Sequence, residues 1–98
     1  MKFIISVLKG FDVGKIQSFS EFPISIGRWT DNDFVLVDPL VSRMHCVIDF
    51  MRGNFYILDL KSANHTIVNE KFLISELPLA NNDNIIIGSN HIKVMIED

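Results

Sequence analysis

Two arginines and a serine stand where this sequence could bind an anion. Arg28 follows Gly27 at the end of an apolar run, and the segment Ser42-Arg43-Met44-His45 leads from a turn into another apolar run. The chain contains only three arginines, and two of them fall in these short segments. A guanidinium group is a planar fork of permanently charged donors, and a neighbouring hydroxyl adds a further hydrogen bond. These residue types therefore indicate a site that holds a phosphate group.

The elements that must position these residues read as short β-strands. Residues 44–50 and 92–96 alternate with a period of two, and other short runs are rich in β-branched and aromatic residues between turn formers. No window longer than about ten residues shows the apolar spacing of a helix. The pattern predicts an all-β sandwich or barrel without a long helix. The expected strands cover residues 3–7, 22–26, 34–37, 44–50, 55–60, 67–68, 85–87 and 92–96.

The composition favours one folded domain spanning residues 1–98, with 48% hydrophobic and 21% charged residues. The net charge of -3 argues against broad nucleic-acid binding, which needs many lysine and arginine contacts to phosphates. One local cationic pocket remains compatible with that charge. No apolar segment approaches the length of a membrane span, so we expect no direct membrane insertion.

Cys46 is the only cysteine, so the chain has no intrachain disulfide and no CxxC motif. We expect it to be a small buried apolar residue. A single thiol is compatible with the reducing cytoplasm, where we expect the protein to reside. The apolar run at residues 3–8 is shorter than a signal peptide requires, because Lys9 interrupts it.

Three segments carry a family resemblance when they are taken together. They are Gly27-Arg28, Ser42-Arg43-Met44-His45 and Asn64-His65-Thr66-Ile67-Val68-Asn69. Their order, spacing and strand context resemble the forkhead-associated (FHA) domain, a phosphothreonine-binding family with the pattern G-R, S-x-x-H, and N-G-T followed by a second N-G. The later stretch Asn82-Asp83-x-Ile85-x-Ile87-Gly88 is similar to the family's G-D-x-I-x-I-G, with Asn82 in place of glycine. The resemblance covers nearly the whole chain. It implies a two-sheet β-sandwich of many short, mostly antiparallel strands.

The resemblance also implies a role for each matched residue. Arg28 would bind the phosphate directly, Ser42 would donate its hydroxyl to it, and Arg43 would add a phosphate or peptide contact. Asn64 would hydrogen-bond the peptide backbone beside the phosphothreonine. His45 would pin the loops from behind the site. The matched positions that would support the site structurally are Gly27, His45 and Thr66.

The chain departs from the family pattern in two turns, where the family has a glycine and this chain has none. His65 and Glu70 replace these glycines, and both central residues of an Asn-Gly type I′ turn have positive φ. Histidine is among the residues enriched at positive φ. Glutamate is less suited to positive φ, so Glu70 favours a different turn type at Asn69-Glu70.

Further departures concern the phosphate contact itself. Ala63 stands where many family members carry Thr or Ser, so it supplies no hydroxyl. Asp31 and Asp33, just beyond Arg28, lower the local positive potential. We therefore expect this site to bind phosphate with lower affinity than the tightest-binding members of the family.

Phosphothreonine-dependent binding of a peptide or protein, in signalling or regulated assembly, is the function that the resemblance implies. The alternative is a degenerate FHA-type scaffold that binds a protein partner independently of phosphate, as in bacterial secretion machinery. Catalysis is disfavoured, because Ser42, His45 and Asp49 lack the glycines of a nucleophile elbow. The three histidines have no metal-ligand spacing, so we expect no metal and no cofactor.

Overall fold

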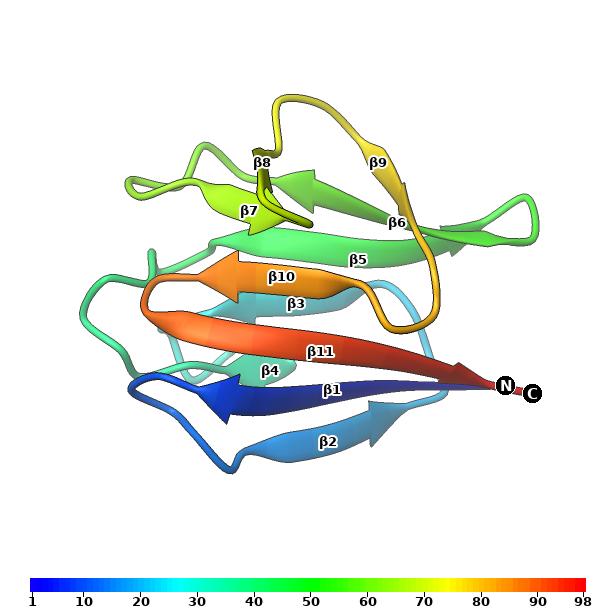
Figure 1. Ribbon diagram of the computed structural model, residues 1–98, viewed down its shortest axis with the longest axis horizontal. Helices are drawn as coiled ribbons and strands as arrows, with labels where there is room; N and C mark the ends of the chain where they lie inside the picture. Colours follow the sequence, from blue (N-terminus) through cyan, green and yellow to red (C-terminus); the bar gives the residue numbers. More distant parts are fainter.

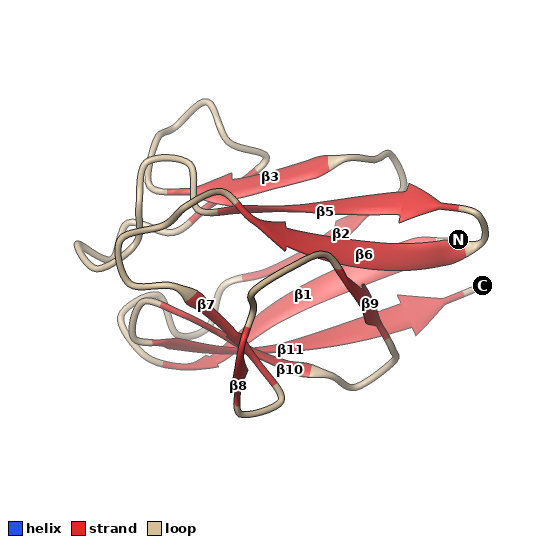
Figure 2. Ribbon diagram, turned by 90° about the horizontal axis from the view of Figure 1, so that it is seen from above, coloured by secondary structure: helices blue, strands red, loops and turns tan.

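Eleven β-strands form two sheets that face each other in the computed structural model, which describes residues 1–98 (Figure 1). The view from above shows the two layers and no helix between or outside them (Figure 2). No helix is therefore present that could cross a membrane. The expected all-β sandwich is confirmed. The strands are β1 (Lys2–Lys9), β2 (Ile16–Phe19), β3 (Ile24–Gly27), β4 (Phe34–Val35), β5 (Cys46–Met51), β6 (Asn54–Asp59), β7 (Thr66–Val68), β8 (Lys71–Phe72), β9 (Leu77–Leu79), β10 (Asn84–Ile87) and β11 (Asn90–Glu97).

The register of the paired strands places their apolar residues on the same face of the sheet. One sheet has the order β2-β1-β11-β10-β7-β8 and the other has the order β4-β3-β5-β6-β9. In the first sheet Phe3 lies opposite Ile96 and Ile5 lies opposite Val94, so the apolar faces of β1 and β11 coincide. All pairings are antiparallel except that of β3 with β4. This register directs one face of each central strand to the core.

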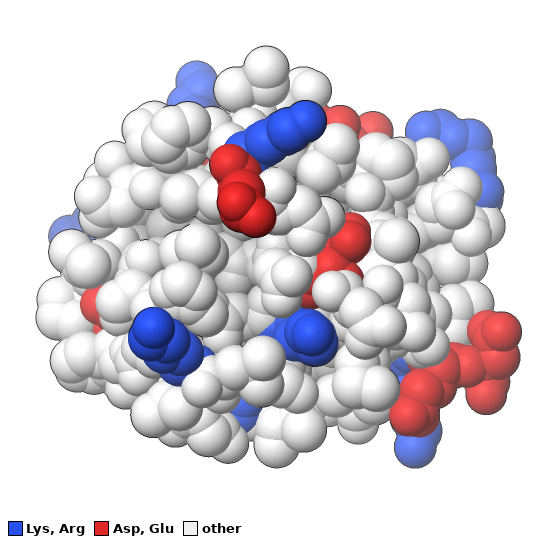
Figure 3. Space-filling model, in the orientation of Figure 1, with Lys and Arg blue, Asp and Glu red and all other residues white.

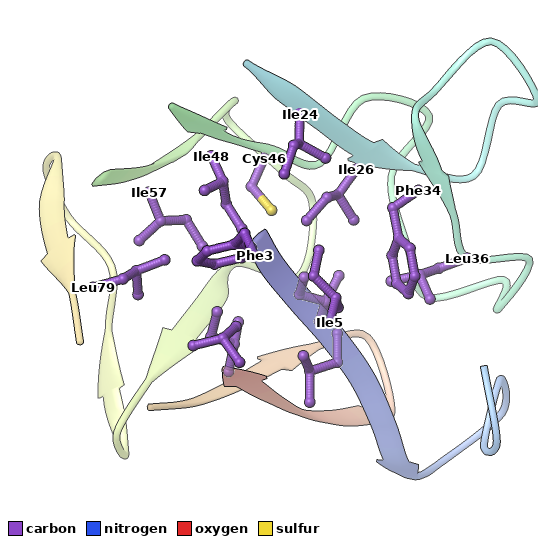
Figure 4. Close-up of a cluster of buried hydrophobic side chains, with 14 of the residues drawn as sticks. Phe3, Ile5, Ile24, Ile26, Phe34, Leu36, Cys46, Ile48, Ile57 and Leu79 are labelled. Carbon is purple, nitrogen blue, oxygen red and sulfur yellow. The ribbon is translucent and has the colours of Figure 1, made fainter. Parts of the chain in front are cut away.

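The core between the sheets holds the strand ends in fixed positions. It contains 18 buried hydrophobic residues, and Figure 4 shows β1 side chains such as Phe3 and Ile5 pointing toward Ile26 and Ile48 of the opposite sheet. Phe3 also meets Phe55 with the ring centres 4.7 Å apart. Loops carried by such a frame hold their side chains at defined places.

Three strands were not expected from the sequence, and each has a physical reason. β2 is largely exposed, so its residues show no alternation. β8 is only two residues long. β9 contains Pro78, which is tolerated because β9 is an edge strand of its sheet.

Two expectations about individual residues are wrong. The strand expected over residues 44–50 begins only at Cys46, so Met44 precedes β5 and is 39% exposed. The second turn was expected to avoid type I′ geometry. Instead, Asn69 and Glu70 form a two-residue loop between β7 and β8 with φ of 49° and 72°, the sign pattern of a type I′ turn. The Asn69 side chain anchors this loop, because its Oδ1 accepts from the N–H of Asn84 at 3.0 Å.

Five loops gather at the end of the sandwich opposite the two termini, on the left in Figure 1. They comprise residues 10–15, 28–33, 36–45, 60–65 and 88–89. The three segments that carried the family resemblance all reach this end. The site is therefore built from loops that the core spaces apart.

Candidate functional site

A surface pocket of about 410 Å³ opens among these loops and collects the four residues expected to bind the ligand. Arg28, Ser42, Arg43 and Asn64 all line it. They come from three loops, which we call the first (residues 28–33), the second (residues 36–45) and the third (residues 60–65) pocket loop, so only the fold brings them together. The remaining lining residues are Trp29, Pro39, Leu40, Val41, Met44 and Ala63.

Arg28 is oriented by the loop opposite it. Its backbone N–H donates to the carbonyl of Ser42 at 3.0 Å, and its Nε donates to the carbonyl of Val41 at 3.1 Å. The two terminal nitrogens of the guanidinium have no hydrogen-bond partner in the protein. The side chain is thus directed by Nε and retains an open fork of charged donors.

Ser42 is held so that its hydroxyl proton is free. Its Oγ accepts a hydrogen bond from the backbone N–H of Ala63 at 2.9 Å. An acceptor bond uses a lone pair of the hydroxyl and leaves its proton to be donated elsewhere. Arg28 and Ser42 therefore present donors to the same pocket.

Gly27 is required by a close approach of backbone. A Cβ atom at this position would stand 2.2 Å from the carbonyl oxygen of Arg43. The loop that carries Arg43 therefore runs directly against the end of β3. Only glycine fits at position 27 without moving this loop, which is the steric reason for its expected role in supporting the site.

Trp29 is a pocket residue that the sequence analysis missed. The Cζ of Arg43 lies 5.6 Å from the centre of its ring. The amide of buried Asn32 donates to the carbonyls of both Trp29 and Arg43, each at 2.8 Å. An aromatic residue directly after Arg28 was the only signal in the sequence, and it matched no motif.

His45 lies behind the pocket, fully buried, and joins two of the loops. The N–H of Ser42 can only donate, so Nδ1 of His45 accepts from it at 3.1 Å. The carbonyl of His65 can only accept, so Nε2 donates to it at 2.8 Å. These partners fix the neutral tautomer that carries its proton on Nε2. Burial lowers the pKa of His45, which favours the same neutral form.

Asp59 at the end of β6 organises the third loop. Its Oδ1 accepts from the hydroxyls of Ser62 and Thr66, each at 2.6 Å, and its Oδ2 accepts from the N–H of Ser62 at 2.9 Å. Burial raises the pKa of Asp59, but these hydrogen bonds and the nearby His45 ring outweigh it, and the net shift is downward. Thr66 thus lies behind the third pocket loop and contacts it through Asp59, at the position where a residue that supports the site was expected.

Asn64 ties the third loop to the second. Its Nδ2 donates to the carbonyl of Leu40 at 2.8 Å, while the side chain stays exposed at the pocket. The Oδ1 atom has no hydrogen-bond partner in the protein. Asn64 therefore presents an acceptor of the kind that a peptide N–H needs.

Two carboxylates that the sequence analysis missed anchor the second loop. Asp12 accepts from the N–H groups of Val37 and Asp38, at 3.0 and 3.3 Å. Asp38 accepts from the N–H groups of Leu40 and Ser89, at 2.9 and 2.8 Å. Asp12 and Val37 lie 25 residues apart, so no local pattern could have revealed this anchoring.

The charges around the site are local. Neither Asp31 nor Asp33 lines the pocket, and Asp33 accepts from the N–H of Ser25 at 2.9 Å on the β3 side. Figure 3 shows Lys and Arg side chains scattered singly over the face in view, with no continuous basic surface there. No group of three or more His, Cys, Asp or Glu side chains is arranged to hold a metal ion. Among the residues that line the pocket, Arg28 and Arg43 are the only charged side chains.

A two-sheet sandwich with a loop-borne pocket of arginine and serine donors defines a class of β-sandwich binding domain. The chain belongs to the FHA domain family, whose sequence model matches residues 24–88. The matched range contains every residue that the sequence assigned to the site. The family resemblance is therefore confirmed.

The glycogen accumulation regulator GarA of Mycolicibacterium smegmatis is similar to this chain, with 34% identity over 85 residues. The match covers 87% of this chain and 53% of GarA, so the chain spans about half the length of this curated relative.

Solved structures give the same family. An FHA domain from a structural and functional analysis of phosphothreonine-dependent FHA interactions matches with a TM-score of 0.88 and 31% identity, over 100% of this chain and 99% of the other. Mycobacterium tuberculosis EmbR, in complex with a low-affinity phosphopeptide, matches with a TM-score of 0.88 and 29% identity. That match covers 97% of this chain and 24% of the EmbR chain.

Proposed function

We propose that this protein is a phosphothreonine-dependent module that binds a peptide or protein partner in signalling or regulated assembly. One observation carries the proposal: the free terminal nitrogens of Arg28 and the free hydroxyl proton of Ser42 face a single open pocket. A phosphate brings close to two negative charges and several strong acceptors, which such donors match. Membership of the FHA family supports the same ligand.

The neighbours add support of their own. One belongs to a study of phosphothreonine-dependent FHA interactions, and another was solved with a bound phosphopeptide. Their similarity extends over 100% and 97% of this chain. We transfer the class of ligand from these proteins and leave the identity of the partner open.

Each pocket residue has a place in the proposed complex. Arg28 binds the phosphate through its terminal nitrogens, Ser42 donates its hydroxyl, and Arg43 adds a second positive charge. Asn64 offers Oδ1 to a backbone N–H of the extended peptide. The three residues behind the loops, Gly27, His45 and Thr66, hold this arrangement.

The functional unit that we propose is the whole of residues 1–98. β1 and β11 lie outside the range matched by the family model, yet they pair with each other as interior strands of the six-stranded sheet. Their removal would expose the core from one side. The free thiol of Cys46 supports a reducing, cytoplasmic location.

A paired library experiment tests the proposal. A degenerate phosphothreonine peptide library and its unphosphorylated twin are screened against the wild type, Arg28→Ala and Arg52→Ala. We expect wild type to select phosphorylated peptides and Arg28→Ala to lose at least about tenfold in affinity, because a charged hydrogen bond contributes roughly 1.5–3 kcal/mol. Arg52, in the turn between β5 and β6, is the matched control and should bind like wild type.

Equal binding of the two libraries by wild type would refute the proposal and favour the phosphate-independent scaffold. The proposed module has no catalytic activity. Generic ester and phosphoester substrates test this cheaply, since turnover of either by the purified chain would require a different function.

A further inference from the structure

Trp29 lies against Arg43 at the edge of the pocket. The Cζ of Arg43 is 5.6 Å from the centre of the Trp29 ring, within the range of an attractive cation–π contact. Both residues line the same pocket as Arg28 and Ser42. Trp29 is 48% exposed, so the contact forms at the surface where a ligand arrives.

The backbone beneath this contact is fixed independently of the two side chains. The Asn32 amide donates to the carbonyls of Trp29 and Arg43, and the N–H of Trp29 donates to the carbonyl of Arg43 at 3.3 Å. All three bonds use only main-chain atoms of residues 29 and 43. Substitution of either side chain therefore leaves the two loops joined.

The two pocket arginines are oriented in different ways. Arg28 is directed by its Nε, which donates to the carbonyl of Val41. Arg43 has no hydrogen bond from its guanidinium to the protein, and the ring of Trp29 is the group that meets it. A long side chain loses rotamer freedom when it binds an anion, and a prior contact removes part of that loss.

We propose that Trp29 is a positioning residue of the phosphate pocket, whose indole ring holds the guanidinium of Arg43 ready for the phosphate. The inference rests on the proposed function and deepens it, because it assigns the pre-orientation of the second arginine. The two arginines of the pocket are then oriented by different groups: Arg28 by a main-chain carbonyl and Arg43 by an aromatic ring.

A double-mutant cycle tests this role with the best phosphothreonine peptide that wild type selects. The variants are Trp29→Leu, Trp29→Phe, Arg43→Ala and the Trp29→Leu/Arg43→Ala pair. Trp29→Leu should weaken binding about two- to fivefold, the range that an exposed cation–π contact supports. Trp29→Phe should bind nearly as wild type, and the double variant should bind no worse than Arg43→Ala alone.

A matched control uses an equivalent contact far from the pocket. The Cζ of Arg52 lies 5.9 Å from the ring centre of Tyr56, and neither residue lines the pocket. Tyr56→Leu should leave the affinity unchanged. Equal losses for Tyr56→Leu and Trp29→Leu would overturn the positioning role, as would additive losses in the cycle.

The fluorescence of Trp29 supplies a second readout, because it is the only tryptophan in the chain. Its emission should change with the phosphorylated peptide, remain constant with the unphosphorylated one, and change less in Arg43→Ala. Arg28→Ala distinguishes a failure of the positioning role from a failure of the proposed function. If Arg28→Ala abolishes binding while Trp29→Leu binds like wild type, the inference alone fails; if Arg28→Ala binds like wild type, the proposed function fails and the positioning role fails with it.

Discussion

The backbone N–H of Ala63 donates to the hydroxyl oxygen of Ser42 at 2.9 Å. The residue that lacks a hydroxyl therefore helps to orient the residue that has one. This bond joins the second and third loops directly at the pocket, and it leaves the proton of Ser42 directed to a ligand. Two predictions about affinity start from this pair.

Ser42→Ala should weaken phosphothreonine-peptide binding by about tenfold or more. The substitution removes a donor to the phosphate, and a hydrogen bond to a charged group contributes roughly 1.5–3 kcal/mol. Isothermal titration calorimetry with the selected peptide measures the loss. Ser75→Ala, which changes an exposed serine outside the pocket, is the control. An unchanged affinity in Ser42→Ala would remove Ser42 from the site.

Ala63→Thr should strengthen binding by roughly three- to tenfold, because it supplies a hydroxyl at the pocket without removing the N–H that Ser42 accepts. Ala63→Val has nearly the same shape and no hydroxyl, so it should show no gain. Titration of both variants with the same peptide distinguishes hydrogen bonding from added bulk. A gain in the valine variant as well would assign the effect to packing.

His45 should make stability depend on pH. Burial lowers its pKa in the folded protein from the usual 6.5, so the unfolded chain binds the proton more readily. The stability that neutral His45 contributes is present above pH 6.5 and is lost as the pH falls below it. The slope is at most about 1.4 kcal/mol per pH unit for one proton.

Urea denaturation at several pH values between 5 and 7.5 measures that slope. His45→Asn should be less stable at pH 7 and should lose this part of the pH dependence. His91→Gln, a change at an exposed histidine, should keep the wild-type slope. Identical slopes in wild type and His45→Asn would show that His45 is not the titrating group.

Thr66→Val should lower the free energy of unfolding by about 1–3 kcal/mol, because it removes the hydrogen bond from the buried Thr66 hydroxyl to the half-buried Asp59 carboxylate. Thr66→Ser retains the hydroxyl and should lose less. The free energies come from urea denaturation at pH 7, with the exposed Thr30→Val as the control. A loss in Thr66→Ser as large as in Thr66→Val would indicate packing rather than the hydrogen bond.

Glu70→Gly should stabilise the protein by about 1 kcal/mol. Glu70 has φ of 72° in the β7–β8 turn, a conformation that is strained for most residues and open to glycine. Thermal denaturation should show a higher midpoint for this variant. Glu76 is exposed and is not at positive φ, so Glu76→Gly should give no such rise.

The part of the fold that the sequence could predict is the part with a local pattern. β1 and β11 alternate, and so they were found; β2 is exposed and β8 is two residues long, so neither carries a period. Arg28, Ser42 and Asn64 were found through their order and spacing. The structure does bring them to one pocket.

The residues that were missed act across long stretches of chain. Asp38 holds Ser89, which is 51 residues away, and Trp29 meets Arg43 across two loops. A turn aspartate or a surface tryptophan has no distinguishing neighbours in the sequence. The prediction of the turn type at Glu70 was wrong for another reason. The short β7–β8 hairpin imposes positive φ on a residue that does not favour it.

The contacts behind the pocket have a consequence for how tightly a ligand can bind. Three positions behind the pocket are held in place: Gly27 lies under a main-chain carbonyl, Ser42 is hydrogen-bonded to buried His45, and Thr66 is hydrogen-bonded to half-buried Asp59. Little ordering of the protein is then left for the moment of association, and less conformational entropy is lost on binding. A pocket with few donors can thus retain useful affinity, because the core has already ordered it.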